Sequence, residues 1–302
     1  MGGFLEGKNI AVTGAGRGIG RAVALACASE GARVVVNDYG VSMAGEDPTS
    51  EVADAVVKEI KDLGGEALAV CDSVATMEGG NRIVQSAIDS WGSIDGVVCV
   101  AGILRERMLF NMTEEEWDPV IATHLKGTFT VFRAACAAMK NQKSGSLVAF
   151  TSGAFAASVA QANYAAAKGG IVSLMRSAAA GMNRYGVNAN AIAPVARTRM
   201  SENVPMDLDE IGDPEDVAAL AVYLLSDEAR HITGQIYTQA GKKIALWNQP
   251  IEIREMRTSE DHWSTTEIAK RLNSEIGQEE MPILAQLEAY RKAAQAKEKA
   301  SS

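Results

Sequence analysis

Short apolar runs alternate with longer amphipathic segments along most of the chain. The run Gly96–Val100 is almost continuously apolar, which is typical of a parallel strand buried on both faces. The longer segments repeat apolar residues every three or four positions, the period of a helix with one buried face. The pattern predicts strands at 8–13, 33–37, 66–71, 95–100, 146–151, 187–192 and 235–239, and helices at 18–29, 50–63, 78–91, 114–139, 162–184 and 214–226.

This regular alternation of strands and helices predicts an α/β fold. The order is typical of a doubly wound, Rossmann-type sheet, mostly parallel and seven-stranded, with helices on both faces. Residues 1–241 form one domain in this interpretation. Residues 242–302 form a C-terminal extension that packs on the same domain or on a neighbouring subunit, and its last residues are expected to fray.

Composition narrows the class of protein. The chain has 302 residues and a formal net charge of −9, which gives no sign of a nucleic-acid-binding surface. Its four cysteines lack CxxC spacing and its three histidines are scattered, so we predict buried thiols and no metal site. The sequence shows no targeting signal and no apolar run long enough to span a membrane. These features predict a cytoplasmic protein without a membrane span.

A glycine-rich segment follows the first predicted strand and opens the first predicted helix. Residues 13–20 read Thr-Gly-Ala-Gly-Arg-Gly-Ile-Gly. Glycines here permit a tight turn, close approach of backbone N–H groups to a pyrophosphate, and close packing of helix on strand. The helix N-terminus directs its positive dipole end at the phosphates. We therefore predict a dinucleotide site that includes Gly14, Gly16, Arg17, Gly18, Ile19 and Gly20.

Asp38 bears on which dinucleotide binds. It stands at the end of the second predicted strand, where a carboxylate can accept hydrogen bonds from the ribose hydroxyls of NAD and repel the 2′-phosphate of NADP. Arg17 argues the other way, because a cation in the glycine loop can pair with that phosphate. Asp38 lies directly at the 2′ position in this arrangement, so we predict NAD.

Tyr164 and Lys168 are the candidate catalytic pair. They are four residues apart on a predicted helix and so share one face, with Ser152 a short loop upstream. A free tyrosine has a pKa of about 10 and is protonated at neutral pH. A cation beside the phenol favours the phenolate and lowers this pKa. The pair is then suited to exchange a proton with an alcohol or a ketone.

These motifs resemble the short-chain dehydrogenase/reductase family, in order, from about residue 5 to about residue 241. They are the segment at 13–20, Ala101-Gly102, Ser152, Tyr164, Lys168 and Ile192-Ala193-Pro194. Within the family, the sequence is most similar to the (3R)-hydroxyacyl-CoA dehydrogenase domains of multifunctional β-oxidation enzymes. That narrower likeness rests on the segments at 34–38, 102–107, 124–127, 161–164 and 198–200.

The resemblance implies a role for each catalytic candidate. Tyr164 exchanges the hydroxyl proton, Lys168 lowers the tyrosine pKa and holds the nicotinamide ribose, and Ser152 donates a hydrogen bond to the substrate oxygen. Counting from the preceding strand favours Ser152, whereas counting back from Tyr164 reaches Thr151, and we favour Ser152. His124 occupies a position where most of the family has an asparagine. It is either a member of a proton relay or a structural histidine bonded to the backbone.

The resemblance also extends the cofactor site. Besides the glycine loop and Asp38, it implies contacts with NAD from Asp72, Ala101, Gly102, Tyr164, Lys168, Pro194 and Thr198. An alternative role for Asp72 is to cap the end of a strand. The family's Asn-Asn-Ala-Gly motif reads Cys99-Val100-Ala101-Gly102, and its Pro-Gly motif reads Pro194-Val195. These departures change residues of the expected cofactor site, whereas Ser152, Tyr164 and Lys168 are all present.

Together these features predict an NAD-dependent oxidoreductase that oxidises a secondary alcohol to a ketone. The expected substrate is a 3-hydroxyacyl-CoA, whose acyl group can be bulky or sterol-derived, and whose phosphates require a basic rim. The alternatives are a dehydrogenase of hydroxysteroids or other bulky alcohols and, more remotely, a non-catalytic NAD-binding protein. The family resemblance also implies a homodimer or homotetramer formed through the helices at 114–139 and 162–184.

Overall fold

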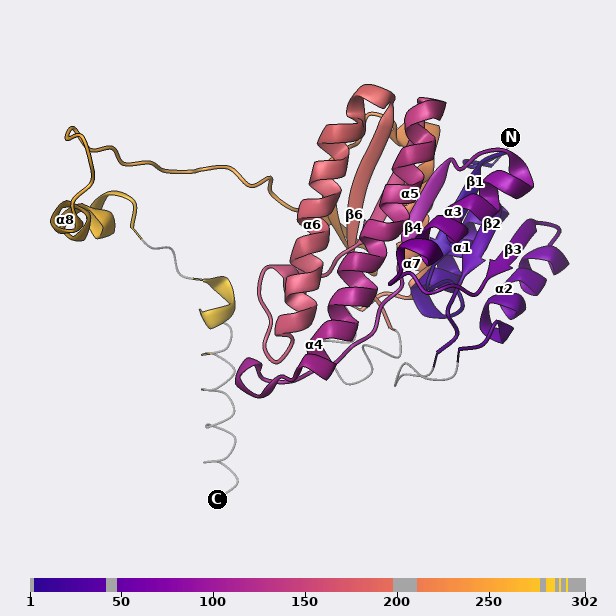
Figure 1. Ribbon diagram of the computed structural model, residues 1–302, viewed down its shortest axis with the longest axis horizontal. Coiled ribbons are helices and arrows are strands. Elements are labelled where there is room, and N and C mark those ends of the chain that lie inside the picture. The colour runs from indigo at the N-terminus through magenta and orange to yellow at the C-terminus, as the bar shows by residue number, and fades with distance from the viewer. Residues whose placement is uncertain are drawn as a thin grey trace, which may run out of the picture. The chain divides into compact units, whose positions relative to one another are not determined.

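An eight-stranded sheet runs through the described part of the chain in the order β3-β2-β1-β4-β5-β6-β7-β8 (Figure 1). The structure is a computed structural model that describes residues 3–41, 48–197, 211–277, 281–285, 288 and 292. Neighbouring strands are parallel, except that β8 is antiparallel to β7. The strands are β1 (Asn9–Thr13), β2 (Arg33–Asn37), β3 (Glu66–Val70), β4 (Gly96–Cys99), β5 (Gly145–Phe150), β6 (Val187–Val195), β7 (Ile236–Ala240) and β8 (Lys243–Leu246).

Helices cover both faces of this sheet. On one face α1 packs against α7, and on the other α3 packs against α5, so the sheet separates two apolar cores (Figure 1). The longer helices of this unit are α1 (Gly18–Ser29), α2 (Glu51–Asp62), α3 (Met77–Trp91), α4 (Glu114–Ile121), α5 (Gly127–Gln142), α6 (Ala162–Met182) and α7 (Pro214–Leu225).

The doubly wound fold class is therefore confirmed, and its topology places the functional cleft. The chain builds β1, β2 and β3 toward one edge, then returns to lay β4 beside β1 and continues toward the other edge. In such sheets ligands bind at the carboxyl ends of the strands, where the direction of winding reverses. The loops after β1, β4 and β5 all leave the sheet at this end.

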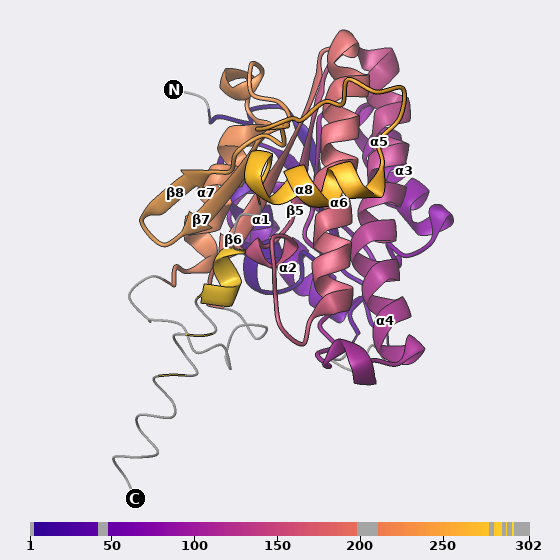
Figure 2. The ribbon, with the colours of Figure 1, turned by 90° about the vertical axis from the view of Figure 1, so that its left-hand side faces the viewer.

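The eighth strand differs from the seven-stranded prediction. Gly241, at φ +49°, and Lys242 form a two-residue turn that folds β8 back along β7 (Figure 2). Just past β8, the indole Nε1 of Trp247 donates to Thr238 Oγ1 at 2.8 Å, and its ring lies 4.5 Å from that of Phe155. The first residues of the predicted extension are therefore part of the sheet, and they brace the segment that follows β5.

The helix predicted at 114–139 is interrupted. α4 leads into a π-helical turn, η2 (Ala122–Lys126), before α5 begins. Helix α4 begins at a capping box between Thr113 and Glu116. Single π-turns inside helices are frequent at functional sites, and this one contains His124.

The chain divides into two compact units, Met1–Trp247 and Asn248–Ser302. In the second unit, the helix α8 (Thr265–Glu275) is capped by the Ser264 hydroxyl, which accepts from Glu267 N. Arg271 pairs with Glu267 and Glu275 along the same helix and lies 5.1 Å from the Trp263 ring centroid. Local charge pairs and one aromatic contact thus hold this short helix.

We predict that Trp247 stabilises the first unit. Trp247→Ala should lower the free energy of unfolding by about 2 kcal/mol, less than the ~3–5 kcal/mol of a fully buried tryptophan, because the ring is only partly buried. Trp247→Phe keeps a ring against Phe155 and loses only the bond to Thr238, so it should cost about 1 kcal/mol. Urea unfolding measures both. Equal losses in the two variants would contradict the assigned ring contact.

Candidate active site

The glycine loop between β1 and α1 is packed so tightly that side chains do not fit. A Cβ on Gly14 would lie 2.7 Å from the Cα of Ala101, and one on Gly20 would lie 2.0 Å from the Gly14 carbonyl oxygen. Gly14 and Gly18 also have positive φ values of 63° and 52°. The loop therefore presents bare backbone at the carboxyl end of the sheet, beside Ala101.

The N-terminus of α1 is free to receive an anion. Arg17 is the N-cap residue, makes no side-chain capping bond, and is followed by no acidic residue in the first turn. The first N–H groups of a helix lack intrahelical partners and favour negative charge. The uncapped helix end and the bare glycine loop together fit the pyrophosphate of a dinucleotide.

Asp38 lies beside this loop, as the sequence predicts. Its Oδ2 accepts a hydrogen bond from Gly16 N at 2.9 Å, and its Oδ1 accepts one from Gly40 N at 2.8 Å. The carboxylate is thus held in a fixed orientation at the end of β2. A negative charge in this position suits ribose hydroxyls and disfavours an additional phosphate.

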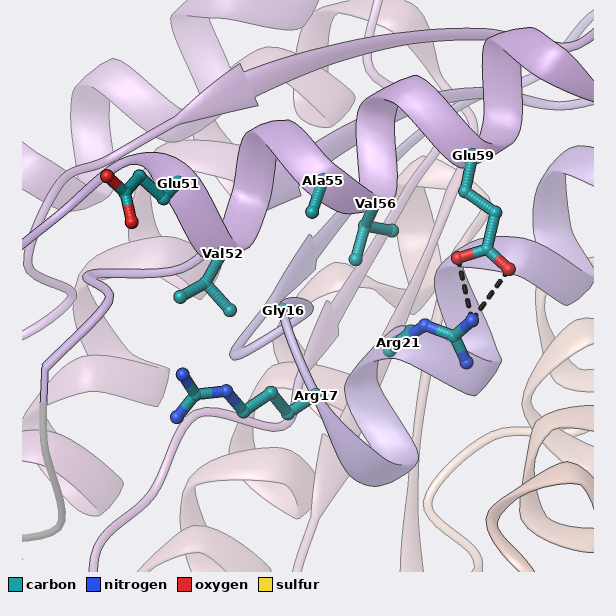
Figure 3. Close-up of a pocket in the computed structure, with 8 residues that line it drawn as sticks. All are labelled: Gly16, Arg17, Arg21, Glu51, Val52, Ala55, Val56 and Glu59. Atoms are coloured by element: carbon teal, nitrogen blue, oxygen red, sulfur yellow. Dashed lines mark hydrogen bonds and ion pairs between the residues drawn. The ribbon is translucent and has the colours of Figure 1, made fainter.

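Arg17 lines a surface hollow of about 320 Å³ between the glycine loop and α2 (Figure 3). Arg21 in the same hollow is paired with Glu59 at 2.6 Å. In Figure 3, Arg17 extends away from this pair, on the side of Val52. The positive charge of Arg17 favours a 2′-phosphate, whereas the negative charge of Asp38 disfavours one.

Asp72 follows β3 and its carboxylate is partly engaged. Its Oδ1 accepts from Arg82 at 2.5 Å, while its backbone carbonyl accepts from the Asn37 side chain at 2.9 Å. The pairing with Arg82 holds the carboxylate at the end of the strand. Both interpretations of Asp72, adenine contact and strand-end support, are compatible with this position.

Tyr164, Lys168 and Ser152 come together at the carboxyl end of β5. Lys168 is 4% exposed, and its Nζ donates to the Phe150 carbonyl at 2.6 Å and lies 5.4 Å from the centroid of the Tyr164 ring. Ser152 begins the short turn η3 (Gly153–Phe155) and hydrogen-bonds the phenol of Tyr164. The structure thus brings the predicted hydroxyl, phenol and ammonium into one cluster.

Thr151 points elsewhere, which distinguishes the two hydroxyl candidates. It is buried, and its Oγ1 donates to the backbone carbonyl of Lys168 at 2.9 Å. Successive residues of an extended strand point to opposite faces, so a hydroxyl at 151 and one at 152 cannot share a direction. Ser152, and not Thr151, faces Tyr164.

The pKa shifts of Tyr164 and Lys168 differ from the expectation that the lysine lowers the pKa of the tyrosine. Burial raises the pKa of Tyr164, and the hydrogen bond from Ser152 opposes that rise. Burial also lowers the pKa of Lys168 to about 7. The expected lowering of the tyrosine pKa is therefore not seen in the protein alone, because desolvation dominates and the ammonium donates to a backbone carbonyl instead of the phenol.

His124 packs directly against Tyr164. The two rings are edge-on, with centroids 5.1 Å apart and an interplanar angle of 86°. Nε2 of His124 lies 2.7 Å from the carbonyl oxygen of Ile103, in the loop after β4. Burial lowers the pKa of this imidazole to about 3.

Asn163 is a buried support that was not among the predicted site residues. Its Nδ2 donates to the carbonyls of Arg105 and Glu116 at 2.9 and 2.7 Å, and its Oδ1 accepts from Tyr164 N at 2.7 Å. It thereby fastens the loop after β4 and the helix α4 to the start of α6. The available signal was a polar residue directly before the candidate tyrosine on an otherwise small and apolar helix face.

Two further predicted cofactor contacts are Pro194 and Thr198. Pro194 is in β6 opposite Gln239 of β7. Thr13 Oγ1 accepts from the backbone N–H groups of Val100 and Ala101, so a threonine supports this loop beside the altered family motif. Thr198 lies outside the described residues.

Metal-binding clusters and membrane-spanning helices are both absent from the described ranges. No three histidine, cysteine or acidic side chains gather there closely enough to hold a metal ion. None of the helices described has both the length and the apolar character needed to cross a lipid bilayer.

Known proteins are similar to this chain over most of its length. Residues 14–241 match the family described as enoyl-(acyl carrier protein) reductase. A hydroxyacyl-CoA dehydrogenase of Mycobacterium tuberculosis is 38% identical over 284 residues, which cover 89% of this chain and 88% of the relative. A peroxisomal hydratase-dehydrogenase-epimerase of Neurospora crassa is 41% identical over 243 residues, covering 80% of this chain but only 27% of that longer protein. The crystal structure of a short chain dehydrogenase from Mycobacterium avium has a TM-score of 0.83 and 42% identity, covering 92% of this chain and 97% of that chain.

We predict that the burial of Lys168 makes stability depend on pH. The unfolded chain holds the lysine proton up to about pH 10.5 and the folded protein only to about pH 7, so the unfolded state binds more protons between these values. Folded-state stability contributed by this group therefore rises with pH across that window. Lys168→Met removes the titrating group, and its stability relative to the wild type should improve as the pH falls from about 10 to about 7. Denaturant unfolding at several pH values measures this difference, and curves that stay parallel would show that Lys168 is not desolvated.

Proposed function

The chain belongs to the short-chain dehydrogenase/reductase family, and from that premise we propose that it oxidises the secondary hydroxyl of a 3-hydroxyacyl-CoA to a ketone, with NAD as the hydride acceptor. The observation that carries the proposal is the cluster of Ser152, Tyr164 and Lys168 at the carboxyl end of β5. It lies at the same end of the sheet as the bare glycine loop and the uncapped N-terminus of α1.

Each side chain of the cluster has a defined task in this proposal. The Tyr164 phenolate accepts the hydroxyl proton of the substrate, and Ser152 donates a hydrogen bond to the same substrate oxygen as its charge changes. Lys168 stabilises the phenolate and holds the nicotinamide ribose. When bound, NAD supplies the carbon that receives the hydride. The raised pKa of Tyr164 in the protein alone means that the phenolate must be favoured by what binds in the cleft.

The preference for NAD rests on Asp38. Its carboxylate accepts hydrogen bonds from Gly16 N and Gly40 N at the end of β2, and in this proposal it also accepts from the ribose hydroxyls. Arg17 is exposed in the neighbouring hollow and is a weaker determinant, because an exposed cation is screened by solvent whereas Asp38 is held by two backbone bonds. We also place Gly14 through Gly20, Asp72, Ala101, Gly102, Pro194 and Thr198 around the bound dinucleotide.

Support for a thioester substrate comes from the relatives. The hydroxyacyl-CoA dehydrogenase of M. tuberculosis matches nearly the full length of this chain. The sequence offers Arg105, Arg107, Arg199, Lys242 and Lys243 as candidates for a basic rim. Arg107 is paired with Glu116 at 2.7 Å, whereas Lys242 and Lys243 are exposed in the turn and strand that precede Trp247. We therefore favour Lys242 and Lys243 for contact with the phosphates of CoA. A bulky or sterol-derived acyl group remains part of the proposal.

A homodimer or homotetramer and a cytoplasmic location complete the proposal. The exposed side chain of Phe129 on α5, 43% accessible, is consistent with a helix that packs against another subunit. The relative from Neurospora crassa is a peroxisomal protein, so a peroxisomal location is the alternative to a cytoplasmic one.

The decisive assay follows NADH formation with (3R)-hydroxyacyl-CoAs and free hydroxysteroids as parallel substrates. We expect turnover of the thioesters, and we expect Tyr164→Phe to reduce it by at least about 10³-fold while leaving the Kd for NAD within about threefold, because the phenol hydroxyl performs the proton transfer and the glycine loop binds the cofactor. Turnover of free steroids alone would replace the thioester proposal with the bulky-alcohol alternative. NAD binding without turnover of any substrate would favour the non-catalytic alternative.

Cofactor preference is tested at Asp38. Asp38→Asn keeps the size of the side chain and removes its charge, so the ratio of kcat/KM for NADP to that for NAD should rise by about tenfold or more. Removing like-charge repulsion worth about 1.4 kcal/mol gives such a change. Arg17→Gln is the matched control and should not raise this ratio. A wild-type enzyme that uses NADP as readily as NAD would contradict the assignment.

A further inference from the structure

We propose that a junction between two segments of the chain sets the position of the Tyr164 ring for proton transfer. Residues 105–107, in the loop after β4, form one side of the junction, and residues 160–163, at the start of α6, form the other. The inference rests on the proposed function, in which Tyr164 is the proton-transfer group. Three hydrogen bonds and one strained residue carry it.

The hydrogen bonds join three consecutive residues of the first segment to the second. They run from Asn163 Nδ2 to the carbonyl of Arg105 at 2.9 Å, from Gln161 Nε2 to Glu106 Oε1 at 2.5 Å, and from Arg107 N to the carbonyl of Ala160 at 2.7 Å. Two of these bonds end on backbone carbonyls, so they hold the main chain itself and not only its side chains. Asn163 is fully buried, so its bond is shielded from competing water.

Ala160 has a strained backbone that the junction holds in place. Its φ is +60°, in the left-handed region that is unfavourable for an L-residue because Cβ approaches the following carbonyl oxygen. Of the residues that the structure describes, Lys143 is the other non-glycine residue with a positive φ, and it caps the C-terminus of α5, where a left-handed residue is common. Ala160 instead precedes a helix. Strain of this kind persists only where surrounding contacts hold it, and it clusters at functional sites. The bond from Arg107 N is the contact that holds it here.

The junction fixes the part of α6 that carries Tyr164. Tyr164 is the third residue of this helix, and the first four N–H groups of a helix have no intrahelical partner. Asn163 Oδ1 accepts from Tyr164 N at 2.7 Å, and Asn163 Nδ2 also donates to the carbonyl of Glu116 in α4 at 2.7 Å. Lys168 anchors only the next turn of the helix to β5. The direction of the first turn, and with it the distance from the phenol to Ser152, therefore depends on the junction.

Substitutions at Ala160 test the junction through its strain. Ala160→Gly suits the left-handed backbone and should keep kcat within about threefold of the wild type. Ala160→Val places a β-branched side chain where that backbone does not accept one, so the junction should rearrange. We expect this variant to lose about 10²-fold in kcat, the cost of a misplaced reacting group, with the Kd for NAD within about threefold. A folded Ala160→Val variant that is as active as the wild type would overturn the proposal.

The Tyr164→Phe background separates positioning of the phenol from a general loss of structure. If the junction acts through the phenol, Ala160→Val should lower the residual rate of Tyr164→Phe by less than about twofold, because the group that it misplaces is already gone. A loss of about 10²-fold that recurs in this background would show that the junction supports the fold and not the phenol, and would overturn the proposal.

A second measurement depends neither on turnover nor on a variant at the strained position. Carbon-13 NMR of tyrosine labelled in the ring should show six signals, of which Tyr164→Phe removes that of Tyr164. Glu106 is exposed, and Glu106→Ala removes the acceptor for Gln161, whereas Glu106→Gln keeps a side-chain oxygen there. The alanine variant should shift the Tyr164 signal and leave the other tyrosines unchanged, and the glutamine variant should restore it. A Tyr164 signal that stays in place in the alanine variant would overturn the proposal. If that signal shifts but no substrate is turned over, the proposed function fails and the junction stands.

Discussion

Two hydrogen bonds between the end of β5 and Lys168 set the geometry on which the rest of the cleft depends. The Lys168 Nζ donates to the Phe150 carbonyl, and the Lys168 carbonyl accepts from Thr151 Oγ1. Helix α6 is thus fastened to the strand both through a side chain and through its own backbone. Tyr164 lies one turn before Lys168 and Ser152 directly follows Thr151, so the same two bonds bring the phenol and the serine hydroxyl together.

This arrangement buries the ammonium group of Lys168, and removing that charge from water is unfavourable. Burial lowers the pKa of Lys168 to about 7, and the same surroundings raise that of Tyr164. A fully charged pair is therefore not the resting state of the protein alone. Groups with such displaced pKa values are typical of functional sites.

Sequence predicted the framework closely and the tertiary detail less well. Helix α1 and strand β2 have the predicted bounds, because glycines flank the helix at both ends and the strand is a short buried apolar run. The π-turn containing His124 was not predicted, because no local sequence signal marks the single extra residue of such a turn. Strand β8 reads Lys-Ile-Ala-Leu and its sequence suggests an extended segment, but its place in the sheet was not predicted, because it is an exposed edge strand outside the regular alternation of strands and helices.

The candidate site residues also divide into features that the sequence predicts and features that depend on the fold. The spacing of Tyr164 and Lys168 was readable from the helical period, as was the glycine loop from its position between strand and helix. The orientation of Ser152 against Thr151 depended on where β5 ends, and the charge states depended on burial, which only the folded chain determines. The spacing of Tyr164 and Lys168 identifies the pair, and the surrounding strand and burial determine its partners and charge states.

The central claim is that Ser152, Tyr164 and Lys168 act as one unit, and the most direct test is the turnover of the triple variant S152A/Y164F/K168M beside that of Y164F alone. Groups that serve a single proton-transfer event are strongly non-additive. The account predicts that the triple variant retains a residual rate within about tenfold of the Y164F rate. A triple variant whose loss is the product of three separate large losses would contradict it, and so would a Y164F variant that keeps most of the wild-type rate.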